Sequence, residues 1–157
     1  MNPEETRALI ERIHQELKEL RIVLTRINDD WERACRSNDD YYLDSVALNL
    51  HGFYSGFERI FALIAETVDK EMPQGEKWHL LLLERMLAEK PEARPAVISP
   101  ASWKTLNELR GFRHVVRNVY THKFDPNKVG LLVVAASPLF EQLTAELSAF
   151  ANFLEQA

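Results

Sequence analysis

The sequence of 157 residues has a single cysteine, Cys35, so no disulfide can form within the chain. Its first residues, MNPEETRALIERIH, lack the apolar stretch that a secretory signal requires. No uninterrupted apolar run approaches the ~20 residues that a membrane-spanning helix needs. We therefore expect a cytoplasmic protein with no membrane partner.

Motifs for metal, nucleotide and acyl-transfer chemistry are also missing. No histidine pairs with the cysteine or with another histidine at zinc-ligand spacing. The histidines are scattered at His14, His51, His79, His114 and His122. There is no glycine-rich nucleotide-binding loop and no G-x-S-x-G nucleophile motif. The sequence thus predicts no metal and no cofactor.

Glycine is scarce, and long segments contain neither glycine nor proline. Apolar residues recur every three or four positions along much of the chain, which predicts helices at about 3–36, 40–70, 77–89 and 127–154. A further helix opens at Ser99-Pro100 and stops at Asp125-Pro126, and Pro138 is expected to kink or restart the last helix. The proline-rich segment 90–100 is a plain connector or a mobile cover. The fold class is all-α, an up-and-down bundle of about five helices in a single domain over 1–157.

Two patterns indicate how these helices pack. The first helix has an apolar seam that repeats every three and four residues, from Ile10 through Leu24 to Trp31. Such a seam requires a second long helix beside it, in the same chain or in a partner subunit. In the second helix, Gly52 and Gly56 lie four residues apart and favour the close approach of a neighbouring helix.

Three further expectations concern burial. The helix at 77–89 is apolar nearly all round and should be well buried. Glu58 and Arg59 should form an ordinary solvated pair. His14 and His51 are expected to be surface or partly buried structural residues.

The charge is unevenly distributed along the chain. The net charge is −5, which argues against a protein coated in basic surface for nucleic acid. Between residues 104 and 128, however, six basic residues face two acidic ones, giving +4, while the rest of the chain carries −9. A local basic patch on an acidic body suits a defined phosphate site, and its plain alternative is a solvated helix face.

The basic patch combines the residue types that metal-free phosphodiester cleavage needs. Arginine can hold a phosphate through two parallel hydrogen bonds, and histidine can move a proton near neutral pH. RNA carries its own nucleophile, the 2′-hydroxyl. We therefore predict that Arg117 binds the scissile phosphate and that His122 acts as general acid or base. The remaining candidates hold flanking phosphates or orient the site, and they are Arg110, Arg113, His114 and Asn118.

Helix geometry sets a condition on this pair. Five residues along an ideal helix turn by about 500°, so Arg117 and His122 would point roughly 140° apart. They converge only if the helix ends or distorts near Tyr120, or if a second subunit completes the site.

This segment resembles the HEPN superfamily. The hallmark of that superfamily is Arg-x4–6-His near the end of a late helix in a bundle of four or five helices, commonly with Asn after the Arg. Here the motif reads Arg117-Asn118-Val119-Tyr120-Thr121-His122. The upstream ELRGFRH and the downstream apolar helix are similar to the HepT-like branch.

The resemblance implies a metal-independent endoribonuclease that works as a homodimer, with the motifs of two subunits lining a shared cleft. Members of the branch commonly act as toxins on RNA, tRNA included, and are often paired with a minimal nucleotidyltransferase (MNT) antitoxin. In some pairs the antitoxin attaches AMP to a tyrosine two residues after the motif histidine. That position is Phe124 here, so this control does not carry over. Tyr120 is the nearest hydroxyl, and modification and packing are both open for it.

Two other interpretations remain open. A non-catalytic HEPN bundle would use the same basic residues to bind RNA, a nucleotide or a nucleotidyltransferase partner. A purely structural helical module would have the Arg-His spacing by chance.

Overall fold

Five α-helices make up the computed structural model, which describes all residues from Met1 to Ala157. The helices are α1 (Pro3–Ser37), α2 (Asp40–Ile64), α3 (Trp78–Leu87), α4 (Pro100–Asn118) and α5 (Pro126–Gln156). A π-helical turn, Ala65–Asp69, extends α2, and a 3₁₀ turn, Thr121–Lys123, lies between α4 and α5. There is no β-strand. The predicted all-α bundle is therefore confirmed.

The helices begin at residues that supply hydrogen bonds to their first turns. The Asn2 side chain accepts a hydrogen bond from the backbone N–H of Glu5, and the Glu5 carboxylate accepts one from the backbone N–H of Asn2. Together they form a capping box. Ser99 and Asp125 cap α4 and α5, each followed by a proline in the first turn. Asn38 ends α1 in the left-handed conformation, with φ 54°.

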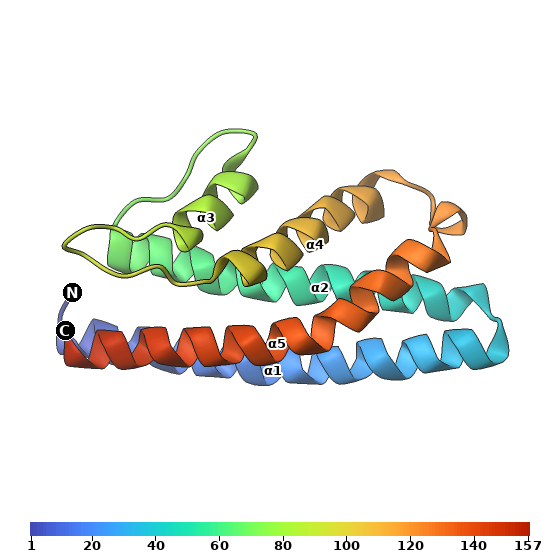
Figure 1. Ribbon diagram of the computed structural model, residues 1–157, viewed down its shortest axis with the longest axis horizontal. Helices are drawn as coiled ribbons and strands as arrows, with labels where there is room; N and C mark the ends of the chain where they lie inside the picture. Colours follow the sequence, from blue (N-terminus) through green and yellow to red (C-terminus); the bar gives the residue numbers. More distant parts are fainter.

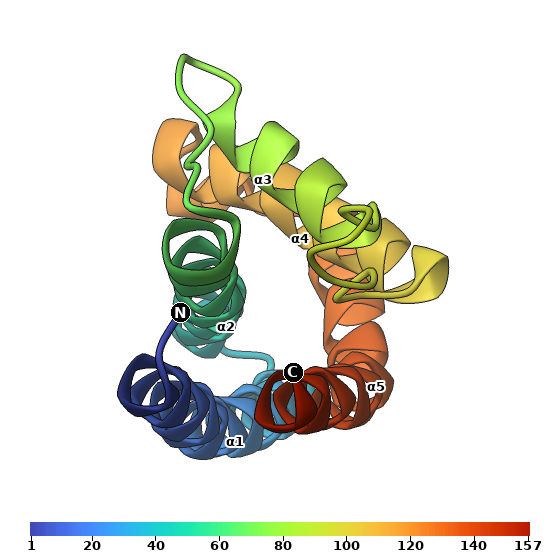
Figure 2. The ribbon, with the colours of Figure 1, turned by 90° about the vertical axis from the view of Figure 1, so that its left-hand side faces the viewer.

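Helices α1 and α2 form a hairpin, and α5 lies along α1 (Figures 1 and 2). The seam of α1 is buried against these neighbours, with Ile13 and Ile27 fully inaccessible to solvent. The partner helix that the seam requires is therefore in the same chain. As a result, the seam itself gives no support to a second subunit.

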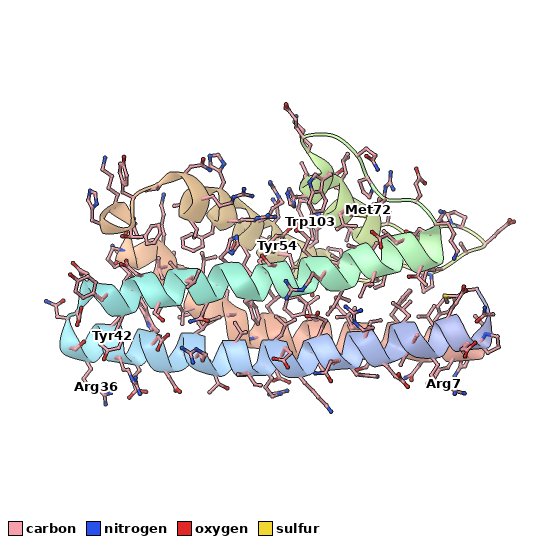
Figure 3. All side chains as sticks on the ribbon, turned by 180° about the vertical axis from the view of Figure 1, so that it is seen from behind. Arg7, Arg36, Tyr42, Tyr54, Met72 and Trp103 are labelled. Atoms are coloured by element: carbon pink, nitrogen blue, oxygen red, sulfur yellow. The ribbon has the colours of Figure 1, made fainter.

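The central helix is α2, which contacts each of the other four. Phe53, Phe57 and Phe61 are fully buried along it, and the rings of Phe53 and Phe57 meet edge to face at 5.1 Å. On its other side Tyr54 faces the layer formed by α3 and α4 (Figure 3). Through this contact, α2 positions the helix that carries the basic patch.

Helix α5 continues through Pro138 without interruption and changes direction part-way along its length (Figure 1). A bend is expected there because proline cannot donate to the preceding turn. By length and composition alone, α5 could cross a membrane, a test that the core helix of a soluble bundle also passes. Its apolar residues include Leu143 and Leu147, which are fully buried inside the bundle.

The connection between α3 and α4 is anchored by one buried ion pair. The Arg94 guanidinium binds both carboxylate oxygens of Asp69, at 2.6 and 2.8 Å, and both side chains are under 5% exposed. Its remaining donors reach the carbonyls of Arg85, Ala88 and Pro95. The segment is therefore a fixed connector, and the alternative of a mobile cover finds no support.

The expectation that the third helix is well buried was wrong in part. Leu82, Leu83 and Met86 are buried, while Leu81 on the opposite side is 39% exposed. The reason is that α3 packs on only one side, against α2 and α4 (Figure 2).

The two glycines of α2 differ in their surroundings. A methyl group at Gly56 would collide with the buried side chain of Leu20, whereas one at Gly52 would meet nothing within 4 Å. We expect Gly52→Ala to stabilise the protein by about 0.5–1 kcal/mol, because glycine weakens a helix interior. Gly56→Ala should instead destabilise it by about 1–3 kcal/mol through overpacking. Urea denaturation of both variants checks this, and equal midpoints would contradict it.

Candidate functional site

Helix α4 ends one residue after Arg117, so the predicted stop at Asp125-Pro126 was wrong by about two turns. Asn118 is its last residue, and Val119 and Tyr120 both have extended backbones. His122 then lies in the short 3₁₀ turn that leads into α5 (Figure 1). The helix break that the Arg117–His122 pair requires is therefore present, and the two side chains belong to different elements.

The structure nevertheless places Arg117 and His122 on separate cavities. Arg117 lines a cavity of about 460 Å³, the basic cavity, which has no hydrophobic residue in its wall. The basic cavity is formed by His79, Arg110, Arg113, His114, Arg117 and Asn118. His122 lines a cavity of about 800 Å³ over the α1–α2 turn. We call this the acidic cavity, and its wall includes Asp39, Asp40, Tyr41, Asp44, Thr121 and His122. Within one subunit, each of these two cavities therefore holds only one of the motif residues.

Four of the predicted flanking residues do gather around Arg117, since they line the same cavity. The side-chain Nδ2 of Asn118 donates to the backbone carbonyl of His114 at 2.8 Å and lies 3.2 Å from His114 Nδ1. Its contacts are thus with His114, one helical turn back. Arg110 Nε donates to Asn107 at 3.0 Å, which leaves its terminal nitrogens without a partner in the protein.

Arg113 lines the basic cavity, yet most of its side chain is buried. Its side chain is 19% exposed, and Nη1 donates to Glu58 Oε1 at 3.1 Å. The same nitrogen lies 2.9 Å from Nδ1 and 3.3 Å from Nε2 of His79, over the imidazole ring. Arg113 therefore leans inward from α4 toward α2 and α3, and the carboxylate of Glu58 is the physical reason.

Glu58 is the residue that the sequence interpretation missed. The expected solvated pair with Arg59 does not form, because Arg59 points to Glu16 at 3.4 Å while Glu58 turns inward and is 8% exposed. The Glu58 carboxylate accepts from the Tyr54 hydroxyl at 3.0 Å and lies 2.6 Å from Nδ1 of His79. Burial and this neighbouring carboxylate raise the pKa of Tyr54 well above its ordinary value.

A signal for Glu58 was present in the spacing. Tyr54, Glu58, Phe61 and Ala65 recur every four, three and four residues, so the acid falls on a buried stripe of α2. His79 gave no comparable signal, because its role depends on α3 packing beside Glu58.

His51 lies on α2, near Arg113 and Arg117 of α4. Its Nε2 is buried and has no hydrogen-bond partner. Burial lowers the pKa of His51, and the charges of Arg113 and Arg117 lower it further, against a smaller opposing effect of Glu58. The ring is therefore held in its neutral form beside the basic cavity.

The end of the motif is fixed by an aromatic contact. Phe124 is buried, with its ring 6.1 Å from that of Phe112 on α4. Tyr120 is 74% exposed, and its ring stacks on His122 at 5.7 Å. The position two residues after the motif histidine is thus a core residue, while the Tyr120 hydroxyl is open to solvent.

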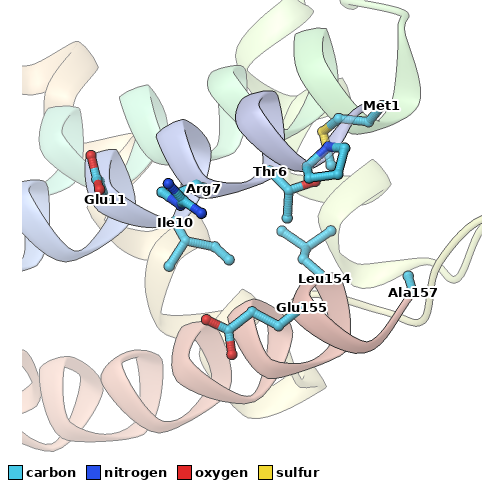
Figure 4. A pocket seen from close by; sticks show the side chains of 9 residues that line it. Met1, Thr6, Arg7, Ile10, Glu11, Leu154, Glu155 and Ala157 are labelled. Atoms are coloured by element: carbon cyan, nitrogen blue, oxygen red, sulfur yellow. The ribbon is translucent and has the colours of Figure 1, made fainter.

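Another cavity, of about 520 Å³, lies between the first turns of α1 and the last turn of α5 (Figure 4). It is at the end of the bundle where both termini lie, away from the junction of α4 and α5 (Figure 1). Its wall includes Arg7, Ile10, Leu154 and Glu155 and contains no histidine or cysteine. It therefore offers no side chain suited to proton transfer near neutral pH.

Comparison with protein families decides the affiliation. A family model described as HepT-like protein matches residues 45–154, more than half of the chain. The chain belongs to the HepT-like family, within the HEPN superfamily. Searches among curated proteins and among solved structures gave no match. The match includes nearly all of α2 and the whole of α3 and α4, and therefore Glu58, Arg117 and His122. Membership suggests a HEPN-type, ribonuclease-like protein.

We expect His51 to make the stability of this HepT-like protein depend on pH. The unfolded chain binds a proton on His51 near the ordinary pKa of 6.5, whereas the folded state binds it only at lower pH. The contribution of neutral His51 to the free energy of unfolding is therefore fully present above about pH 6.5 and is lost as the pH falls below that value. We expect the free energy of unfolding to decrease less between pH 7.5 and pH 5.5 in His51→Gln than in the wild type. Urea denaturation measures this, with exposed His14→Gln as control; identical slopes in all three proteins would disprove the assignment.

Proposed function

We propose that this HepT-like protein is a metal-independent endoribonuclease, the toxin component of a HEPN/MNT-type toxin–antitoxin pair in the cytoplasm. The observation that carries the proposal is the Arg117-x4-His122 motif at a broken helix end, with Arg117 on a wholly polar, arginine-rich cavity. Such a cavity suits a phosphodiester, because arginine holds its charge and offers paired donors to phosphate oxygens.

The proposed reaction needs no metal. Arg117 donates to the non-bridging oxygens of the scissile phosphate and stabilises the charge that accumulates in the crowded transition state. The imidazole of His122 takes the proton of the 2′-hydroxyl or gives one to the leaving 5′-oxygen. The 2′-oxygen forms a bond to phosphorus as the bond to the 5′-oxygen breaks. The products are a 2′,3′-cyclic phosphate and a 5′-hydroxyl end.

The separation of the motif residues supports a site shared between two subunits. His122 lies beside Asp39, Asp40 and Asp44, whose charge repels an RNA phosphate approaching one subunit alone. The basic cavity of a second subunit, with Arg117, complements this acidic surface.

Exposed apolar residues lie along the same side of α2. Tyr41, on the acidic cavity, is 82% exposed, and Leu48, two turns further on, is 66% exposed. Exposed apolar side chains beside complementary charges suit a homodimer interface.

We further propose a nucleotidyltransferase of the MNT type as the antitoxin partner. Phe124 is buried where the tyrosine that receives AMP stands in some of these pairs, so control through that position is unavailable. Tyr120, exposed and stacked on His122, is the hydroxyl nearest to the motif. Modification of Tyr120 would add a phosphate group beside the motif histidine and block access to it.

A non-catalytic bundle is the second candidate function, and one observation favours it. Arg117 and His122 face different cavities in the single chain, so a monomer would bind RNA, a nucleotide or the nucleotidyltransferase partner through the basic cavity without cutting.

The catalytic assignment predicts the behaviour of two single variants. With EDTA present, we expect purified wild-type protein to cleave RNA and both Arg117→Ala and His122→Ala to cleave at least about a hundredfold more slowly. His14→Ala, which changes an exposed histidine on α1, should retain the wild-type rate. Equal cleavage by wild type and His122→Ala, or no cleavage of several RNA substrates by wild type, would rule out the catalytic proposal.

The shared site predicts that the two inactive variants restore activity when combined. If Arg117 of one subunit acts with His122 of the other, a dimer of Arg117→Ala with His122→Ala has one intact and one doubly changed site. Random exchange should then recover about a quarter of the wild-type activity. If both residues act within one chain, every site of the mixed dimer lacks a group and no activity returns. The mixture is measured after refolding together, and mixing His122→Ala with itself is the control.

A further inference from the structure

Arg94 and Arg113 each bind a buried carboxylate, but they use their donors differently. Arg94 has every nitrogen engaged, with five hydrogen bonds to Asp69 and to three carbonyls. Arg113 uses only Nη1, its Nε is buried without a partner, and Nη2 has no protein partner. Arg113 therefore keeps a free donor, Nη2, for a ligand, whereas Arg94 is complete as a structural link.

His79 is held beside Arg113 by the same carboxylate. Its Nδ1 lies 2.6 Å from Glu58 Oε2, a charge-assisted distance at which Nδ1–H donates. The nearby Arg113 Nη1 is also a donor, so its 2.9 Å approach to Nδ1 is ring contact and not a second hydrogen bond. This arrangement leaves Nε2 of His79 without an acceptor in the protein. His79 also lines the basic cavity.

We propose that His79 and Arg113, both held by Glu58, form a phosphate-binding seat that takes the RNA phosphate next to the one bound by Arg117. The proposal rests on RNA being the substrate, as proposed above. Arg113 and Arg117 are four residues apart on α4, a rise of ~6 Å along the helix, which suits neighbouring phosphates of one strand. Protonated His79 contributes Nε2–H, and Arg113 contributes Nη2–H.

Glu58 is the positioning residue of this seat. It does not line the basic cavity itself, yet it fixes the tautomer of His79 and the direction of Arg113. The Tyr54 hydroxyl satisfies the carboxylate from the opposite side. Burying this charge is costly unless all its partners are present, so the seat is assembled before the ligand arrives.

A ligand that cannot be cut tests the seat separately from catalysis. We would titrate wild-type protein with a fully 2′-O-methylated oligoribonucleotide and record the ¹⁵N resonances of the histidine rings. Nε2 of His79 should shift on binding, and Nδ1 should show the protonated signature before and after. His14, exposed on α1, should not shift. An unmoved His79 resonance at saturation would overturn the proposal, as would a shift with inorganic phosphate but none with the oligonucleotide.

Variants then measure what the seat contributes. His79→Gln should bind the methylated oligonucleotide about tenfold more weakly at fixed salt, as expected for loss of a charge-assisted hydrogen bond. Glu58→Gln should redistribute the His79 tautomers, which a purely structural role would not do. His14→Gln should bind as wild type, and unchanged affinity in His79→Gln would contradict the seat. If binding behaves as expected but wild type cuts no RNA, catalysis fails while the seat stands.

Discussion

A single buried carboxylate connects the three helices on which the candidate site depends. Glu58 on α2 holds His79 of α3 and Arg113 of α4, and Tyr54 completes its coordination. A buried charge destabilises a fold unless it is paired and hydrogen-bonded, and here several groups share that task. The consequence is mechanical as well as electrostatic: α4 cannot rotate about its axis without losing the ion pair. The orientation of Arg117, one turn further along α4, is thereby set from the core.

Arg117 and His122, the two ends of the motif, lie in surroundings of opposite charge. Arginines dominate the cavity of Arg117, and their field helps to keep His51 neutral beneath it. Aspartates surround His122 at the α1–α2 turn. Such an arrangement is unfavourable for an anion that must touch both residues of one chain. It becomes favourable when the basic surface of one subunit meets the acidic surface of another, because each then neutralises the other.

Much of the fold could be predicted from the sequence, since helix periods, caps and prolines are local signals. The bounds of α1 and the start of α5 follow from Pro3 and Asp125-Pro126 in this way. The contacts within the candidate site were harder to predict from the sequence. The helix was predicted to run to Asp125-Pro126, and a break between Arg117 and His122 was only one of two conditions for their convergence, whereas α4 ends at Asn118. Glu58, His79 and the inward turn of Arg113 were not predicted. Those contacts join residues 21 to 55 positions apart, and no spacing rule within one helix encodes them.

The helix break gives the motif spacing a physical meaning. In a continuous helix, His122 would point roughly 140° away from Arg117 and into a fixed direction relative to α4. Ending α4 at Asn118 releases the chain, and burial of Phe124 against Phe112 then fixes where it goes. The intervening residues carry the histidine to the cavity over the turn between α1 and α2. The motif therefore connects two surfaces of one subunit, which is why the proposed catalytic pairing of an arginine with a histidine calls for a second subunit.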